Sequence, residues 1–248
     1  MITRKSKDQI ALMRRAGRIV AEIHDACTRV AKPGVTTARL DAVAREVIER
    51  RGARSNFLNY HGFPAVICAS PNDVIVHGIP GEYRLVEGDI LSIDAGAIVE
   101  GWHADAAVTI PIGQVDPEAQ RLMDVTRRSL DEAIAHAVPG KHLGDIGAAV
   151  EAVATEAGFT VVREYVGHGI GTAMHEEPPV PNYGHPGRGV RLKEGYVLAI
   201  EPMVNQGKPE TETLQDGWTV VTRDGSLSAH FEHTVAITDD GPLVLTLP

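Results

Sequence analysis

The sequence predicts an α+β protein in which a mostly antiparallel sheet carries helices on its outer face. Helical patterns occur in pairs and are followed by groups of strand patterns, whereas a parallel sheet would need strands and helices to alternate. The chain is also internally repeated, with related halves at about 10–112 and 117–240. Its 248 residues suffice for one domain with a sizeable core. We therefore expect a single domain, 1–248, with pseudo-two-fold symmetry.

The first half begins with an amphipathic helix, because apolar residues recur at helical spacing from Ile10 to Val30. A Pro-Gly turn ends this helix. Thr36 or Thr37 can cap a second helix, which stops at Gly52. Runs rich in Val and Ile then predict strands. These strands are expected at 65–69, 89–94 and 106–110.

The second half repeats this plan. Helices are predicted from about Pro117 to His136 and from Leu143 to Ala157. Strand patterns follow the second of these helices. They lie near 160–166, 196–201, 218–222 and 233–237.

The repeat is visible residue by residue. Residues 87–94 read EGDILSID and residues 194–201 read EGYVLAIE. Two further pairs of segments align, 31–53 with 137–159 and 103–110 with 230–237. A repeat of roughly a hundred residues is far longer than a solenoid unit. The sequence therefore favours two similar halves packed face to face.

Corresponding acids occupy both halves. Asp94 and Glu201 end the two near-identical segments, and Asp105 corresponds to Glu232 downstream. A lone buried carboxylate costs several kcal/mol or more, and a group of them would repel one another strongly in a low-dielectric interior. We therefore expect the acids to meet near the pseudo-two-fold axis and to share a metal.

A nitrogen ligand and a turn strengthen the metal hypothesis. His168 can add an imidazole to the carboxylate oxygens, and this ligand set suits Mn, Fe, Co or Zn rather than a thiolate site. Gly96 and Gly101 predict a hairpin or bent connection between the first-half acids. Neighbouring strands lie about 4.8 Å apart, so the two carboxylates can reach a common ion. Two ions about 3.5 to 4 Å apart, bridged by carboxylates, form a recognised arrangement for activating water.

Composition excludes several classes of protein. The formal charge of −9 disfavours a nucleic-acid ligand, because phosphate binding needs a basic face. Residues 1–15 carry charges and no long apolar run, which is unlike a signal peptide or a membrane anchor. Cys27 and Cys68 are too few and too far apart for a disulfide framework, which fits a reducing cytoplasm. We expect a cytoplasmic monomer that binds neither membrane nor nucleic acid.

Other histidine motifs are weaker signals. GHGIG at 167–171 lacks the GxGxxG spacing of a dinucleotide loop, and His175-Glu-Glu is not the HExxH of a zincin. His233 follows Glu232 on a predicted strand and should point to the opposite face. Histidines on predicted helices or loops are expected at the surface. These are His24, His136, His142 and His185.

Short motifs follow one another along nearly the whole chain. They are YHGFP at 60–64, VHGIP at 76–80, IDAGA through HADAA at 93–107, YVGHGIGTAMHEEP at 165–178, IEPM at 200–203, DGWTV at 216–220 and SAHFEHTVAIT at 228–238. Together, and in this order, they resemble a type I methionine aminopeptidase. The resemblance implies the duplicated pita-bread fold of these metallopeptidases, in agreement with the internal repeat, and a single catalytic domain.

The resemblance also implies the cofactors. By it, Asp94 binds one of two divalent ions, which are Co, Mn, Fe or Zn. Asp105 and Glu232 bridge both ions. His168 with Glu201 completes the coordination of the other ion. A monovalent cation, Na or K, is further implied near Asn72, Val74 and Ser228.

Catalytic and substrate-binding residues follow from the same resemblance. His77 and His175 are similar to the two histidines of the family that contact the scissile amide of the substrate, and Glu201 is expected to accept the proton of the activated water. Phe57 and Met174 stand where bacterial relatives often carry Cys and Phe. The residues that match the pocket for the methionine side chain are Tyr60, Phe63, Cys68 and Trp218, beside His77 and His175.

The function implied is that of a metal-dependent hydrolase that removes the N-terminal methionine from nascent proteins and peptides whose second residue is small. Its partners would be the N-termini of nascent polypeptides, at the ribosome. A type II enzyme would carry a helical insertion for which the segment 177–194 leaves no room. Two alternatives remain open: a prolidase-like dipeptidase, which shares the five ligands, and a catalytically inactive pita-bread binding module, which typically loses some of them.

Overall fold

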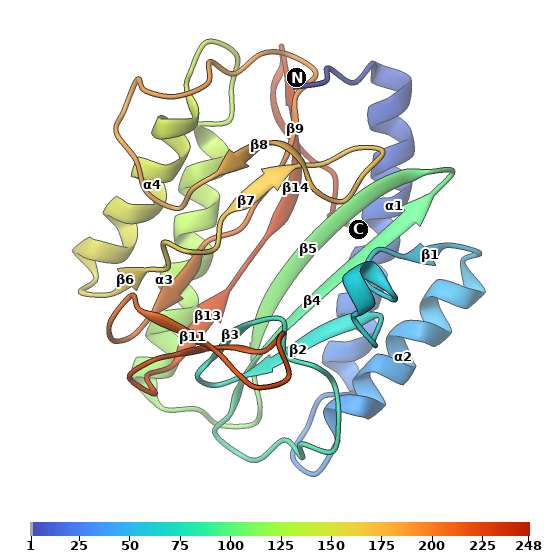
Figure 1. Cartoon of the computed structure of the whole chain (residues 1–248), viewed down its shortest axis with the longest axis vertical. Helices are drawn as coiled ribbons and strands as arrows, with labels where there is room; N and C mark the ends of the chain where they lie inside the picture. The colour runs from blue at the N-terminus through green and yellow to red at the C-terminus, as the bar shows by residue number, and fades with distance from the viewer. Residues whose placement is uncertain (1) are drawn as a thin grey trace.

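A computed structural model of the chain describes residues 2–248. Its helices flank a central group of strands, with α1 (Lys7–Val30) and α2 (Thr37–Arg50) on one side and α3 (Pro117–Ala135) and α4 (Leu143–Glu156) on the other (Figure 1). Every strand pair in the described residues is antiparallel. The predicted α+β class with outer helices is therefore confirmed.

Local sequence signals account for the helix ends. Ser6 begins α1 with a capping box, in which its side chain accepts a hydrogen bond from the Gln9 amide and the Gln9 side chain accepts one from the Ser6 amide. Thr36 caps α2, as one of the two threonines was expected to do. Asp116 caps α3, and Pro117 occupies the first turn, where a missing N–H costs nothing. Each of the four helices lies within a few residues of its predicted range.

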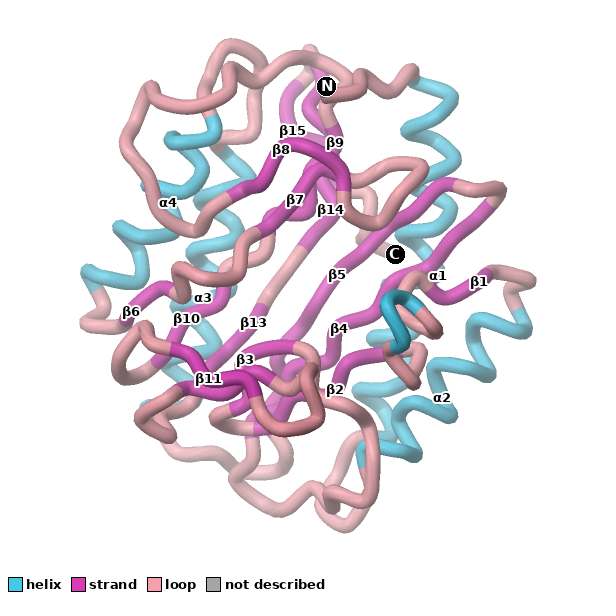
Figure 2. The backbone as a smooth tube through the Cα atoms, viewed as in Figure 1, coloured by secondary structure: helices cyan, strands magenta, loops and turns pink. Residues whose placement is uncertain are grey.

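The first half is built on a long hairpin of β4 (Ile90–Val99) and β5 (Trp102–Pro111), which Figure 2 shows as the longest pair of strands. Glu100 and Gly101 form its turn, both with positive φ. The strand that we expected to end at Asp94 continues to Val99, because the small residues after Asp94 extend the ladder with β5. The remaining strands of this half are β1 (Arg54–Ser55), β2 (Ile67–Pro71) and β3 (Val74–Val76).

Strands of the second half are shorter and more numerous. A five-stranded sheet has the order β15-β14-β9-β7-β8. The predicted strand at 160–166 is a strand only at its first two residues, and the one at 218–222 begins at Val220 because Asp216 holds the amides of Trp218 and Thr219 in a turn. The strands are β6 (Thr160–Val161), β7 (Gly167–Gly169), β8 (Glu176–Val180), β9 (Val197–Ile200), β10 (Met203–Asn205), β11 (Thr211–Thr213), β12 (Val220–Thr222), β13 (Ser228–His230), β14 (His233–Thr238) and β15 (Gly241–Val244).

The two halves meet along β5 and the start of β14. The amide of Glu232 donates to the carbonyl of Ala107 at 2.9 Å, and the Thr234 hydroxyl lies between the amide and the carbonyl of Asp105, at 2.9 and 2.7 Å. Repeat-related segments are thus in direct contact. This junction brings the acids of the first half to those of the second.

No helix in residues 2–248 has the length and the apolar character needed to cross a membrane. The helices instead bury one apolar face each. Residues of α1 and α2 pack with β2, β4 and β5 in one core cluster, whereas residues of α3 and α4 pack with β9 and β14 in another. The junction between the halves lies between these two cores.

Candidate metal and catalytic site

One cavity of about 330 Å³ collects the expected divalent-metal ligands, catalytic histidines and pocket residues, but not Asn72, Val74 or Ser228. Its polar lining consists of the expected metal ligands and histidines: Asp94, Asp105, His168, Glu201, Glu232, His77, His175 and also His61. Its apolar lining consists of Phe57, Tyr60, Phe63, Cys68, Met174 and Trp218. The fold thus unites segments from residue 57 to residue 232 at one place.

Each acid lies within or next to a strand at the junction of the halves. Asp94 lies within β4 and Asp105 within β5, two strands paired along their whole length. Glu201 directly follows β9, and Glu232 directly precedes β14; these strands are also paired. His168 comes from β7, on the other side of β9. The repeat therefore places one acid pair on each side of the junction.

The geometry of these side chains fits a cation. Ligand atoms of Asp105, His168 and Glu232 all lie within 4.8 Å of one another. One carboxylate oxygen of each of three acids, Asp94, Asp105 and Glu232, is buried and has no hydrogen-bond partner among the described residues. Buried oxygens that lack a donor are costly unless an ion satisfies them. The donor set therefore fits divalent metal ions.

His168 is oriented for ligation through Nε2. Its Nδ1 is 2.9 Å from the carbonyl oxygen of Gly169, an acceptor, so Nδ1 carries the proton and donates it. The Nε2 lone pair is then free toward the acids, 3.6 Å from Oε1 of Glu201. Burial lowers the pKa of His168 to about 3, so the ring is neutral, as a metal ligand must be.

Without a cation, the ionised forms of these acids are destabilised. Burial raises the pKa of Asp105 and of Glu232 well above the ordinary range, and the neighbouring carboxylates raise both further. Burial also raises the pKa of Asp94 to about 7 and that of Glu201 to about 8. Like charges in a low-dielectric space disfavour ionisation of each other. Divalent cations would reverse this effect by stabilising the ionised forms.

Comparison with known proteins decides the family. The model of metallopeptidase family M24 matches residues 11–239. This chain belongs to metallopeptidase family M24. As members of that family also use divalent metals, the metal interpretation of the acid cluster agrees with the assignment.

Individual M24 relatives match over their full length. A methionine aminopeptidase of Clostridium acetobutylicum is 50% identical and covers 100% of this chain and 99% of its own. Methionine aminopeptidase 1 of Bacillus subtilis is 48% identical, with 99% of each chain covered. The crystal structure of methionine aminopeptidase from Thermotoga maritima has a TM-score of 0.98 at 41% identity and covers 100% of both chains. The resemblance found in the motifs is confirmed.

A solved structure of lower identity shows only the fold. Prolidase from Pyrococcus furiosus has a TM-score of 0.81 at 21% identity and covers 99% of this chain, whereas this chain spans 65% of the prolidase. The pita-bread fold is therefore shared, as the internal repeat predicted. At this level of identity the likeness says nothing about substrate.

His230, which lies beside Glu201 at the acid cluster, was not predicted from the sequence. Its Nε2 lies 3.6 Å from Oε2 of Glu201, the side chain is buried, and Nε2 has no hydrogen-bond partner in residues 2–248. The available signal was the repeat, in which His230 corresponds to His103. His230 is thus near one carboxylate oxygen of Glu201, and His168 is near the other.

Five other histidines lie outside this cavity. His24 was expected at the surface and is buried, because it lies on the face of α1 that packs against β4 and β5; burial lowers its pKa to about 4. His233 was expected to point away from Glu232, and its Nδ1 is indeed 2.8 Å from the hydroxyl of Thr246. His136 and His142 are half-buried, His185 is exposed as expected, and none of the three lines the cavity.

Metal binding to the acid cluster is expected to release protons. Because burial raises the pKa of Asp94 to about 7 and that of Glu201 to about 8, these carboxyls hold protons near pH 7 in the metal-free protein, and an incoming ion must displace them. The apparent affinity should therefore strengthen as the pH rises from 6 to 8. Calorimetric titration in two buffers of different ionisation enthalpy measures the protons released. A binding enthalpy independent of the buffer at pH 7 would contradict this expectation.

Proposed function

We propose that this chain removes the N-terminal methionine from proteins and peptides whose second residue is small. The observation that carries the proposal is the single cavity in which an acid cluster suited to metals adjoins an apolar pocket. Full-length relatives at 48% to 50% identity that are methionine aminopeptidases support the same activity. The catalytic unit would be one domain spanning 1–248, with halves at about 10–112 and 117–240.

Asp94, Asp105, His168, Glu201 and Glu232 would hold two divalent ions, drawn from Co, Mn, Fe or Zn. When bound, such ions polarise a carbonyl group and lower the pKa of water toward neutrality. Oxygen ligands accept several metals, so availability would select among them.

A monovalent cation, Na or K, is proposed near Asn72, Val74 and Ser228. The Ser228 amide donates to the Asn72 carbonyl at 2.9 Å, which brings these two segments together.

Glu201 is proposed as the group that accepts and transfers the proton of the attacking water. It lines the cavity among the expected metal ligands, and bound cations would keep its carboxylate ionised, which is the form that accepts a proton. His168 and His230 lie on either side of the carboxylate, each 3.6 Å from one of its oxygens.

His175 and His77 are proposed to contact the scissile amide. The Tyr60 hydroxyl is 2.7 Å from Nδ1 of His175, and burial raises the pKa of Tyr60, so this hydroxyl keeps its proton and can donate it. His175 would then carry its own proton on Nε2, ready to donate to the oxygen on which charge develops. Burial lowers the pKa of His77 to about 4, so this ring is neutral too.

An aromatic pocket would receive the methionine side chain. Phe63 packs edge-to-face on Trp218 with ring centroids 5.1 Å apart, and on Phe57 at 6.4 Å. Cys68 lines the same cavity, and burial raises its pKa, so it stays a neutral, weakly polar thiol. Met174 completes a flexible wall. Such walls suit an unbranched thioether, because sulfur interacts favourably with aromatic rings.

The substrates would be free N-termini of nascent polypeptides. We propose cytoplasmic action by a monomer, at the ribosome and without direct recognition of nucleic acid, in keeping with the charge of −9. Cys27 and Cys68 are both free and buried, which suits a reducing compartment.

Activity on Met-Ala-Ser, compared with Pro-containing dipeptides, tests the function against its rivals. The chain is treated with a chelator, and single divalent metals are then restored. Metal-dependent release of methionine from Met-Ala-Ser supports the proposal. Preferential cleavage of the Pro-containing dipeptides would show a prolidase-like enzyme, and metal binding without any cleavage would show a binding module.

Peptides that begin Met-Ile are expected to be cleaved about 10²-fold more slowly than those that begin Met-Ala. A branched second residue would crowd the metal centre and the residues around His77, and a misplacement of about 1 Å at the reacting carbonyl can cost about 10²-fold in rate. Initial rates for a peptide series varied only at the second residue, with Met-Gly as a second small case, measure the effect. Equal kcat/KM for Met-Ile and Met-Ala peptides would refute the crowding argument.

A further inference from the structure

The loop 170–175, hereafter the pocket loop, supplies Met174 and His175 to the cavity. It joins two short strands, β7 and β8, whose register shifts between His168 and Gly169. Strands also hold its first two residues, because the Ile170 amide donates to the Val197 carbonyl at 3.2 Å and the His103 amide donates to the Gly171 carbonyl at 2.8 Å. The position of the His175 ring must depend on contacts that the loop makes elsewhere.

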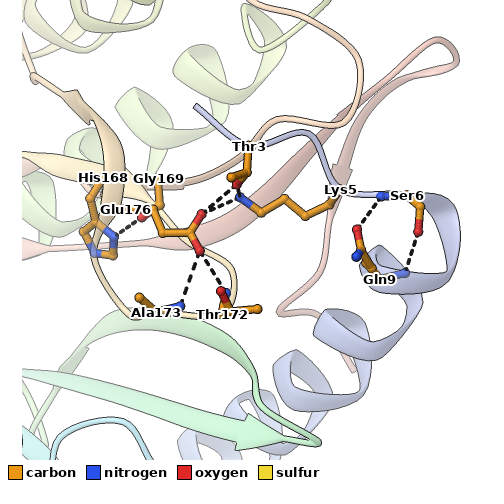
Figure 3. Close-up of polar contacts among 9 residues, drawn as sticks. All are labelled: Thr3, Lys5, Ser6, Gln9, His168, Gly169, Thr172, Ala173 and Glu176. Atoms are coloured by element: carbon orange, nitrogen blue, oxygen red, sulfur yellow. Dashed lines mark hydrogen bonds and ion pairs between the residues drawn. The ribbon is translucent and has the colours of Figure 1, made fainter. Parts of the chain in front are cut away.

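The Glu176 carboxylate provides those contacts (Figure 3). Its Oε1 accepts hydrogen bonds from the amides of Thr172 at 2.9 Å and Ala173 at 3.3 Å, so it closes the pocket loop on itself. Its Oε2 accepts from Nζ of Lys5 at 2.6 Å and from the hydroxyl of Thr3 at 3.0 Å. Hydrogen bonds to an ionised partner are about twice as strong as neutral ones. One carboxylate thus ties the pocket loop to the N-terminal segment.

The Lys5 side chain is unusually enclosed for a lysine. It is 3% exposed, and the Glu176 side chain is 16% exposed. Burial raises the pKa of Glu176, but the hydrogen bond and the charge of Lys5 outweigh that effect and lower the pKa overall, so the pair is ionised. Gly171 permits this close packing, because a Cβ there would lie 2.5 Å from Oε1 of Glu176 and 2.6 Å from Cε of Lys5.

The N-terminal segment is itself held firmly. The Lys5 amide donates to the Gly195 carbonyl at 2.7 Å, and Nε of Arg4 donates to the Glu194 carbonyl at 2.6 Å. Ser6 then begins α1 with its capping box (Figure 3). Lys5 therefore projects from a fixed point, between the turn before β9 and the first residue of a 24-residue helix.

We propose that Lys5 and Glu176 are positioning residues for His175, and that their ion pair clamps the pocket loop against the N-terminal segment. His175 directly precedes Glu176, and its ring lies 4.2 Å from that of His168. A small rotation of the loop would move this ring away from the reacting amide without disturbing the metal ligands. The kinetic part of the proposal rests on the proposed function; the structural part does not.

Lys5→Met tests the clamp, and Arg29→Met is its control. Both variants lose one positive charge, but Arg29 lies in the last turn of α1 and pairs with Asp25, with both side chains 64% exposed. With Met-Ala-Ser, Lys5→Met should lower kcat by about 10- to 100-fold, as expected for a misplaced group, with little change in KM or metal content. Arg29→Met should stay within about twofold of the parent, because exposed pairs contribute little.

A double variant separates positioning from a general loss of structure. If Lys5 acts through His175, then Lys5→Met should have almost no further effect on kcat in a His175→Ala background. Multiplication of the two single effects would overturn the proposal. So would unchanged kcat in Lys5→Met. If Lys5→Met does not fold, Glu176→Gln replaces it in the same pair of comparisons, because the amide oxygen can still accept from the loop amides while the charge is lost.

Ring ¹⁵N chemical shifts of His175 in the metal-free protein give a readout that needs no activity. Lys5→Met should change these shifts and Arg29→Met should not; identical shifts in all three proteins would overturn the clamp. If the parent chain fails to cleave Met-Ala-Ser, the proposed function fails, whereas the ¹⁵N comparison still decides whether Lys5 and Glu176 position the ring.

Discussion

Replacement of Asp105 or Glu232 with alanine is expected to abolish turnover and to lower the metal content while the protein stays folded. Both carboxylates lie at the junction of the halves, each with a buried oxygen that has no donor among the described residues. Without one of them, two cations would repel each other across a short gap. The fold should survive, because the loss of one buried carboxylate relieves repulsion in the metal-free state.

Elemental analysis, circular dichroism and activity on Met-Ala-Ser measure these three effects together. Glu118→Gln is the control, since it also removes one negative charge but lies exposed on α3, where Glu118 pairs only with Arg121. This control should keep full activity and metal content. Full activity in either the Asp105 or the Glu232 variant would rule out the dinuclear assignment.

His175→Ala is expected to lower kcat and kcat/KM together by about 10² or more, with metal stoichiometry intact. Such a pattern is typical of an interaction made mainly in the transition state. The ring of His175 is hydrogen-bonded to Tyr60 and lies beside His168, so it faces the cavity without belonging to the close group of ligand atoms. Steady-state kinetics and metal analysis on the same preparation give the answer.

His61→Ala is the matched control for this variant. His61 also lines the cavity and also packs against Tyr60, with ring centroids 4.4 Å apart, but the Tyr60 hydroxyl is hydrogen-bonded to His175 and not to His61. Its removal should change kcat/KM by only a few fold. Loss of one metal equivalent in His175→Ala would show that His175 is a ligand and not a transition-state donor.

The acid cluster could be predicted because the chain is duplicated. A single strand-end acid has several ordinary explanations, but corresponding acids in both repeats point to a shared partner on the axis between them. All five expected ligands do line one cavity. The extent of β4 could not be predicted in the same way, since the small residues after Asp94 become a strand only through their pairing with β5.

The depth at which a side chain is buried could not be predicted from local sequence patterns either. Periodicity indicates which residues share a helix face, but it does not say how closely that face packs, and so His24 was expected at the surface. His230 was missed although the repeat pairs it with His103, because its role depends on the distance to Glu201, which belongs to a different strand segment.

The helices, the threonine cap of α2, the repeat and the grouping of the acids could all be predicted, since each of these depends on neighbours along the chain or on comparison of the two halves. What surrounds the reacting groups depends on the tertiary structure. Lys5 and Glu176 are separated by 171 residues, and their ion pair exists because the N-terminal segment and the pocket loop pack together. Contacts of such separation leave no local pattern, because they are fixed by how the two halves close on each other.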